Sequence, residues 1–223
     1  STGYMSRGGL AGAVDSKTFS LCLALKRVDT GTHVIFDSRS SSSLKVLIDF
    51  NATNEFNVQM WNHSGTKVFQ SSNLNTIVDA GSWFVLQMSV DLSDTAKRSL
   101  YINNQQMSPN WSTYINDFID FTNDASVVGR YGSNSSYYIN GDLSFTYFTT
   151  DYIDFSQESE RLKFVDAFGY PVDIRPKIES GEIPTPLIYM PFDDPNDLGK
   201  NLGTGGDFTV NGTVVPGSDV SPA

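Results

Sequence analysis

The stretch Thr18-Phe19-Ser20-Leu21-Cys22-Leu23-Ala24-Leu25-Lys26 decides the fold of this chain. Large apolar side chains alternate here with small ones, which is the period of a pleated β-strand. The large side chains are Phe19, Leu21, Leu23 and Leu25, and the small ones are Ser20, Cys22 and Ala24. None of these side chains is charged, so both faces of the strand can be buried. We therefore expect this strand to lie inside a sheet that is covered on both sides.

Further short apolar stretches, separated by turn residues, continue along the chain. We predict strands over residues 33–37, 44–50, 55–61, 67–69, 83–91, 99–104, 126–131, 143–148, 187–190 and 208–210. Residues 55–61 alternate between apolar and polar, and the turn Asn62-His63-Ser64-Gly65 then predicts a hairpin with the next strand. So many short strands with frequent turns favour an all-β sandwich or jelly roll.

One segment has the pattern of a helix, over residues 156–169. Ser156 can cap its start, and Gly169 would end it. Glu158 and Glu160 favour the helix dipole in the first turn, and Leu162, Val165 and Phe168 would share one face. We predict one domain over 1–223, made of an N-terminal segment (1–17), a jelly-roll core (18–155), this helix, and a Pro-rich extension (170–223) that packs on the sandwich.

The composition excludes several functional classes. The chain has 15 Lys and Arg against 25 Asp and Glu, a formal charge of −10 and a pI near 4.5. This charge repels phosphate backbones and anionic lipids, so we expect neither nucleic acid nor a membrane as partner. The lone Cys22 cannot form an internal disulfide, and its apolar neighbours predict a buried side chain rather than a nucleophile. Residues 1–6 show no secretory signal pattern.

Five of these strands carry motifs in the order of one known family. Residues 18–26 resemble the "fsl-w-k" strand of concanavalin A-like, laminin-G-like jelly rolls. The segments 81–86, 99–104, 127–130 and 138–145 resemble the family's "g-W-h-v", "l-Y-v-N-G", "i-i-G" and "f-G-x-i-d-e-v-r" strands, with Asn104 in place of the usual glycine. The resemblance implies a concanavalin A-like β-sandwich jelly roll with one short helix and a Pro-rich C-terminal extension.

The sequence carries no recognisable catalytic motif of that superfamily. Its glucanases place three carboxylates as Glu-x-Asp-x-x-Glu on one strand, so that alternate side chains enter the cleft. The five glutamates of this chain, Glu55, Glu158, Glu160, Glu179 and Glu182, have no such spacing. His33 and His63 belong to no metal-binding or triad motif, so we expect a strand-end and a turn residue. We therefore predict a protein that is not an enzyme and needs no cofactor.

Calcium is the one ion that the sequence leaves open. Related jelly rolls hold Ca²⁺ through Asp and carbonyl oxygens on loops at the rim of the sandwich. Asp91 with Asp94 is one candidate pair, and Asp193, Asp194 and Asp197 form a second candidate group. Neither set has a complete ligand spacing, so the prediction is no metal, with Ca²⁺ as the alternative.

Carbohydrate recognition needs an exposed aromatic plane with amide or carboxylate groups beside it. The segments around 111–114 and 131–142 meet this description. The candidate ligand-binding residues are Trp111, Tyr114, Tyr131, Tyr137, Tyr138, Asn140 and Asp142. The alternative is structural: Trp111 and Tyr114 would cover a sheet edge or an intersubunit contact, and Tyr138 would pack under its own hairpin. Trp61 and Trp83 lie in predicted strands, where we expect them in the core.

The last quarter of the chain adds a second resemblance. Residues 164–173, 183–190 and 202–212 are similar to the tail of laminin-G-like domains in structural proteins of tailed phages. This implies a virion surface protein, such as a head fibre, decoration protein or tail-fibre module, that contacts other virion proteins and glycans or the host surface; a fibre would be a trimer. The alternative is a secreted or surface-displayed extracellular lectin, and a weaker one is a carbohydrate-active enzyme with an unrecognised site.

Overall fold

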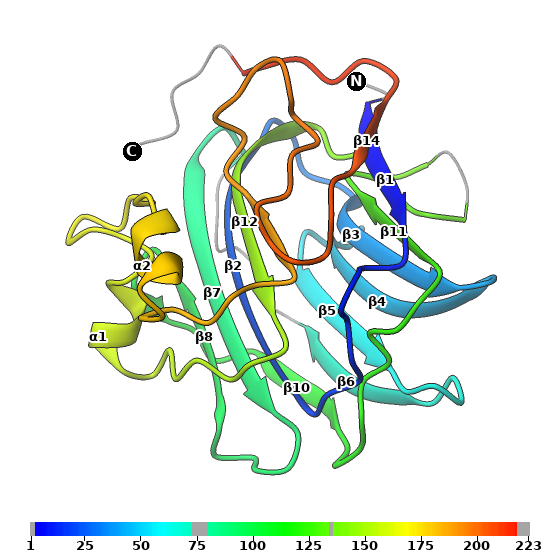
Figure 1. Ribbon diagram of the computed structural model, residues 1–223. Coiled ribbons are helices and arrows are strands. Elements are labelled where there is room, and N and C mark those ends of the chain that lie inside the picture. Colours follow the sequence, from blue (N-terminus) through cyan, green and yellow to red (C-terminus); the bar gives the residue numbers. More distant parts are fainter. Residues whose placement is uncertain (1–2, 73–79, 134–135, 218–223) are drawn as a thin grey trace.

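A computed structural model describes residues 3–72, 80–133 and 136–217. In these residues two antiparallel sheets pack face to face (Figure 1). The larger sheet contains β1 (Tyr4–Gly8), β3 (His33–Ser40), β4 (Ser43–Phe50), β5 (Phe56–Trp61), β6 (Lys67–Ser72), β10 (Asn110–Tyr114), β11 (Ala125–Val128) and β14 (Thr209–Asn211). The smaller sheet contains β2 (Thr18–Arg27), β7 (Trp83–Asp91), β8 (Arg98–Ile102), β9 (Gln105–Gln106), β12 (Gly141–Thr149) and β13 (Ile188–Met190).

The strand order shows how distant parts of the chain meet. The eight-stranded sheet runs β10-β6-β5-β4-β3-β11-β1-β14, and the six-stranded sheet runs β13-β12-β2-β7-β8-β9. The last part of the chain gives one edge strand to each sheet: β14 pairs with β1, and β13 pairs with β12. The C-terminal quarter of the chain therefore forms one edge of each sheet.

Strand β2 confirms the expectation drawn from its alternating pattern. It pairs with β7 on one side and β12 on the other. The large side chains of β2 enter the core between the sheets; they are Phe19, Leu21, Leu23 and Leu25. Cys22 and Ala24 belong to a second apolar cluster on the outer face. Every residue from Phe19 to Leu25 is at most 1% exposed. A strand buried on both faces needs apolar or small side chains at every position, which is what this stretch supplies.

The second cluster lies between the six-stranded sheet and the segment that carries α1 (Glu158–Arg161) and α2 (Arg175–Glu179), as Figure 1 shows. Tyr147 of β12 meets Phe164 with ring centroids 4.9 Å apart. The buried Arg161 ties the segment down, because its Nη1 donates to the carbonyl of Phe155 at 2.7 Å and its Nε donates to Asn104 Oδ1 at 2.6 Å. This layer covers part of the outer face of the six-stranded sheet, which would otherwise face water.

The predicted helix over 156–169 is wrong in its extent, because α1 ends at Arg161. Beyond it, Asp166 Oδ1 accepts hydrogen bonds from the backbone N–H groups of Phe168 and Tyr170, which closes a turn. Val165 pairs with Pro171 in an isolated β-bridge. An aspartate that binds nearby backbone N–H groups competes with helical hydrogen bonds. Ser156 does not cap the helix either, since Gln157 is the N-cap residue and its side chain makes no capping bond.

The edge strand β10, strand β1 and the short α2 went unpredicted. These elements are short and partly exposed, so their sequences carry little periodic signal. Neither described helix is long enough to span a lipid bilayer.

Cys22 is fully buried, as predicted, and desolvation raises the pKa of its thiol well above its usual range. The reactive form of a thiol is the thiolate, which this environment disfavours. We expect no reaction of the native protein with a disulfide reagent such as dithionitrobenzoate, and full reaction in denaturant. Rapid labelling under native conditions would contradict the packing described for β2.

Candidate functional site

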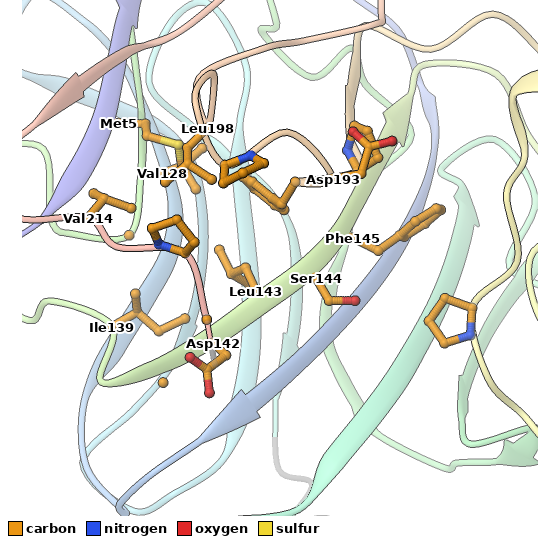
Figure 2. Close-up of a pocket in the computed structure, with 18 of the residues that line it drawn as sticks. Met5, Val128, Ile139, Asp142, Leu143, Ser144, Phe145, Asp193, Leu198 and Val214 are labelled. Carbon is orange, nitrogen blue, oxygen red and sulfur yellow. The ribbon is translucent and has the colours of Figure 1, made fainter. Parts of the chain in front are cut away.

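A groove of about 600 Å³ follows β12. Figure 2 shows Asp142, Leu143, Ser144 and Phe145 along this strand, with Leu198 and Val214 on segments to the left of it. The groove exists because β13 pairs only with residues 146–148 of β12. The first half of β12 is therefore bordered by irregular chain rather than by another strand, which leaves space between them.

A cross-strand row of three side chains forms the polar and aromatic part of this region. Trp83, Lys26 and Asp142 are register partners on β7, β2 and β12. Lys26 Nζ lies 3.3 Å from Asp142 Oδ2 and 5.7 Å from the centre of the Trp83 ring. The Trp83 Nε1 is buried and has no hydrogen-bond partner in the described part of the chain. A buried N–H of this kind is normally satisfied, so a water molecule is its expected acceptor.

Arg175 also lines the groove and is held by two carboxylates. Its Nε donates to Asp173 Oδ1 at 2.8 Å, and its Nη1 donates to Asp193 Oδ2 at 2.7 Å. The hydrogen bonds to Asp173 raise the pKa of Arg175 above its usual value, and the same contact lowers the pKa of Asp173. The three side chains are about half exposed, so they fix each other's orientation while remaining open to a ligand.

The remaining wall is apolar. It is formed by Met5, Val128, Ile139, Leu143, Leu198 and Val214. The groove thus combines an apolar side, an indole ring and a few fixed polar groups, which is the usual composition of a small-molecule site. The described lining contains no histidine or cysteine, and its carboxylates are paired with cations. These contacts suit binding of a polar, ring-shaped ligand.

Of the seven predicted ligand-binding residues, only Asp142 lines this groove. Tyr131 and Tyr137 pair with each other instead, with ring centroids 6.1 Å apart. Tyr131 also lies over the Arg39 guanidinium at 4.5 Å. Tyr137 is 51% exposed, so this pair remains a candidate aromatic surface outside the groove.

Tyr138 and Asn140 take part in a hydrogen-bond network with the turn before β3. The ring of His33 lies between the Tyr138 carbonyl, 3.0 Å from Nδ1, and Asp29 Oδ1, 2.5 Å from Nε2. Asn140 Nδ2 donates to Asp29 Oδ2 at 2.7 Å, and this bond lowers the pKa of Asp29. The side chains of His33, Asp29 and Asn140 hold the loop to the turn, so their polar groups are already engaged. Tyr138 contributes its carbonyl, and its ring centre lies 6.3 Å from that of Tyr4.

Trp111 and Tyr114 lie far along the eight-stranded sheet, on its edge strand β10. Both rings pack on Phe69 with centroids 6.0 Å away, and Tyr114 Oη donates to the carbonyl of Asp91 at 2.7 Å. Burial raises the pKa of Tyr114 above its usual range. Their contacts are those of the structural alternative, in which they cover the sheet edge.

Trp83 and Arg175 are groove residues that sequence reasoning missed, and Trp83 was expected in the core. It is only partly buried, because its neighbour Phe84 takes the inward position on β7. The signal was present: Trp83 follows a Gly-Ser turn, and side chains at successive strand positions point to opposite faces.

The acidic residues considered for calcium are engaged in local contacts. Asp91 Oδ1 accepts bonds from the Ser93 N–H and hydroxyl, and Asp94 Oδ1 accepts the N–H of Ala96. Asp193 is bound to Arg175, and Asp194 Oδ1 accepts the N–H of Asn196. In the described ranges, no three His, Cys, Asp or Glu side chains are grouped to hold a metal ion.

A buried acid also lies outside the groove. Asp49 of β4 is 7% exposed, and its Oδ1 accepts a 2.8 Å bond from Asn57 Nδ2 on β5. Burial raises the pKa of Asp49 to about 6, while the bond from Asn57 opposes this shift. On the neighbouring strand, the buried Asp37 accepts two 2.8 Å bonds from Arg39. Within the described part of the chain, Asp37 is paired with a cation and Asp49 is not.

Comparison with known proteins finds no matching family model and no matching curated protein. Among solved structures, a protein from Bacteroides ovatus, to which carbohydrate binding has been assigned provisionally, aligns over 100% of this chain with a TM-score of 0.65 and 14% identity. A heptameric SAP-like pentraxin from Limulus polyphemus aligns over 72% of this chain and 75% of its own, with a TM-score of 0.47 and 12% identity. The carbohydrate-binding module (CBM40) of a Ruminococcus gnavus sialidase aligns over 68% of this chain and 89% of its own, with a TM-score of 0.47 and 10% identity.

The chain spans 60% of the length of the Bacteroides ovatus protein. At this level of identity the similarity concerns the fold alone. The chain has the antiparallel two-sheet sandwich of the concanavalin A-like and laminin-G-like proteins, with only very short helices, as the order of its strand motifs predicted.

Proposed function

We propose that this chain is a non-enzymatic carbohydrate-binding module that holds a glycan in the groove beside β12. The observation that carries the proposal is the composition of the groove: Trp83, Asp142 and Arg175 line it, and Lys26 pairs with Asp142 beside the Trp83 ring. An aromatic plane can stack on the C–H face of a sugar ring, and fixed carboxylate and guanidinium groups can bind its hydroxyls.

The fold supports the same proposal, since the Bacteroides ovatus protein with the same architecture is assigned to carbohydrate binding. The virion role rests only on the resemblance of the C-terminal segments. Neither the groove nor the comparisons add support for it, so we place the lectin alternative first. We propose an extracellular or surface-displayed location, where glycans are met.

Replacement of Trp83 by Ala should weaken glycan binding about 5- to 30-fold, because truncating a central aromatic contact costs roughly 1–2 kcal/mol. A glycan array of neutral and acidic sugars identifies a ligand for the native protein, and titration calorimetry then measures both affinities. Trp83→Phe should restore part of the affinity, since it keeps a stacking plane.

Trp61→Ala is the matched control. Trp61 also lies at the end of a strand, is partly buried, and has a lysine ammonium 5.1 Å from its ring centre, but it does not line the groove. Equal loss of affinity in both variants, with unfolding midpoints lowered alike, would argue for a general loss of structure. Full affinity in Trp83→Ala would place the ligand elsewhere and overturn the proposed site.

A further inference from the structure

A second hollow of about 130 Å³ adjoins the groove. The two cavities share Trp83 and Pro171 in their linings, so they adjoin at these two residues. Beyond them, the second hollow is bordered by Phe168 and Tyr170. The aromatic surface therefore continues from Trp83 past the limit of the main groove.

Phe168 is the most exposed large apolar side chain among the described residues, at 84%, and Tyr170 is 43% exposed. Exposure of this kind costs solvation free energy and often marks an interaction site. The turn that carries Phe168 is fixed rather than loose. Asp166 N–H donates to the Tyr170 carbonyl at 2.8 Å, and Asp166 Oδ1 accepts from Phe168 and Tyr170. Gly169, with φ of 85°, supplies the left-handed position that the turn requires.

The charges of the groove indicate which sugars it can take. Its lining contains three carboxylates, Asp142, Asp173 and Asp193, against one guanidinium. That guanidinium, Arg175, is bonded to two of the carboxylates, and the adjacent Lys26 is paired with the third. The other nearby cation, Arg130, is stacked on the Tyr4 ring at 3.8 Å. An acidic sugar would have to displace a carboxylate from its partner and face the remaining ones, within a chain of net charge −10.

We infer that the groove and the second hollow together bind a linear, neutral oligosaccharide, with Trp83 under its centre and Phe168 and Tyr170 under one end. This inference rests on the proposed function of the groove and adds the length and charge of the ligand. A chain of several sugar rings covers both cavities, whereas a short one occupies the groove alone.

The test uses the native protein and Phe168→Ala, with neutral tri- and hexasaccharides of the cello-, malto-, manno- and xylo- series and two acidic probes, 3′-sialyllactose and hexagalacturonate. We expect the native protein to bind one neutral hexasaccharide more tightly than its trisaccharide. Phe168→Ala should lower the affinity for the hexasaccharide about 3- to 10-fold, which corresponds to loss of one aromatic contact. It should leave the affinity for the trisaccharide unchanged. Both acidic probes should bind at least 10-fold more weakly than the neutral hexasaccharide.

Phe118→Ala is the matched control. Like Phe168, Phe118 is an exposed phenylalanine, with 51% of its surface accessible, but it lines neither cavity. It should leave both affinities unchanged. If the native protein binds no sugar at all, the proposed function itself fails. If sugars bind in the groove and Trp83→Ala abolishes binding, but Phe168→Ala leaves the hexasaccharide affinity unchanged or an acidic probe binds best, the function stands and this inference is overturned.

Discussion

Arg39→Met should lower the free energy of unfolding by about 3–5 kcal/mol, which is the usual cost of removing one partner from a buried ion pair. Asp37 is fully buried and accepts both of its short hydrogen bonds from this guanidinium. Without Arg39, the carboxylate would stay in an apolar site or take up a proton, and either outcome costs free energy. Urea denaturation of the native protein and the variant at pH 7 measures the difference.

The surrounding chain leaves Asp37 little room to adjust. A Cβ at Gly132 would lie 2.6 Å from Asp37 Oδ1, and Tyr131 covers Arg39 from the other side. Asp37→Asn in the Arg39→Met background should recover a large part of the loss, because it removes the unpaired charge. Lys200→Met, which breaks the exposed pair with Asp207, is the control and should have little effect. A similarly small effect of Arg39→Met would contradict the buried-pair account.

Asp49→Asn should stabilise the protein at pH 7 by about 2–3 kcal/mol, since a shift of one pKa unit corresponds to about 1.4 kcal/mol. The pKa of Asp49 is raised from 3.8 to about 6 by burial, so the folded state holds this proton more tightly than the unfolded state. The native protein has the full benefit of that proton below pH 4 and loses it as the pH rises through 6. The amide of the variant has no charge to desolvate at any pH.

The measurement is the difference in unfolding free energy between Asp49→Asn and the native protein from pH 4 to pH 8, which cancels the titration of the other groups. The difference should grow between pH 4 and 6 and level off above 7. Asp207→Asn is the control of opposite sign, because the pKa of Asp207 is lowered by its hydrogen bonds and its contribution is lost as the pH falls. A pH-independent difference for Asp49→Asn would mean that Asp49 stays ionised in the folded state.

Much of the sandwich could be predicted from local pattern. Strand β2 could be predicted from the sequence, because a strand buried on both faces must have apolar or small side chains at every position. Residues 19–25 meet that condition. The helix over 156–169 was predicted from the same kind of rule, and the prediction is wrong beyond Arg161. There the Asp166 carboxylate binds the backbone N–H groups of Phe168 and Tyr170, which stabilises a turn instead of a helix. Patterning therefore succeeded where burial dictated the side chains and failed where a single side-chain hydrogen bond decided the backbone.

The sequence by itself determined the two-sheet architecture, the buried state of Cys22 and the acidic charge, because these follow from residue type and short-range periodicity. Only the tertiary structure decided the site. Trp83, Asp142 and Arg175 are separated by tens of residues, and they meet because β7, β2 and β12 are neighbours in the sheet and the segment after α1 folds back over it. No local pattern of residues predicts that these side chains lie together. Their proximity depends on the strand order and on which half of β12 is not paired with β13.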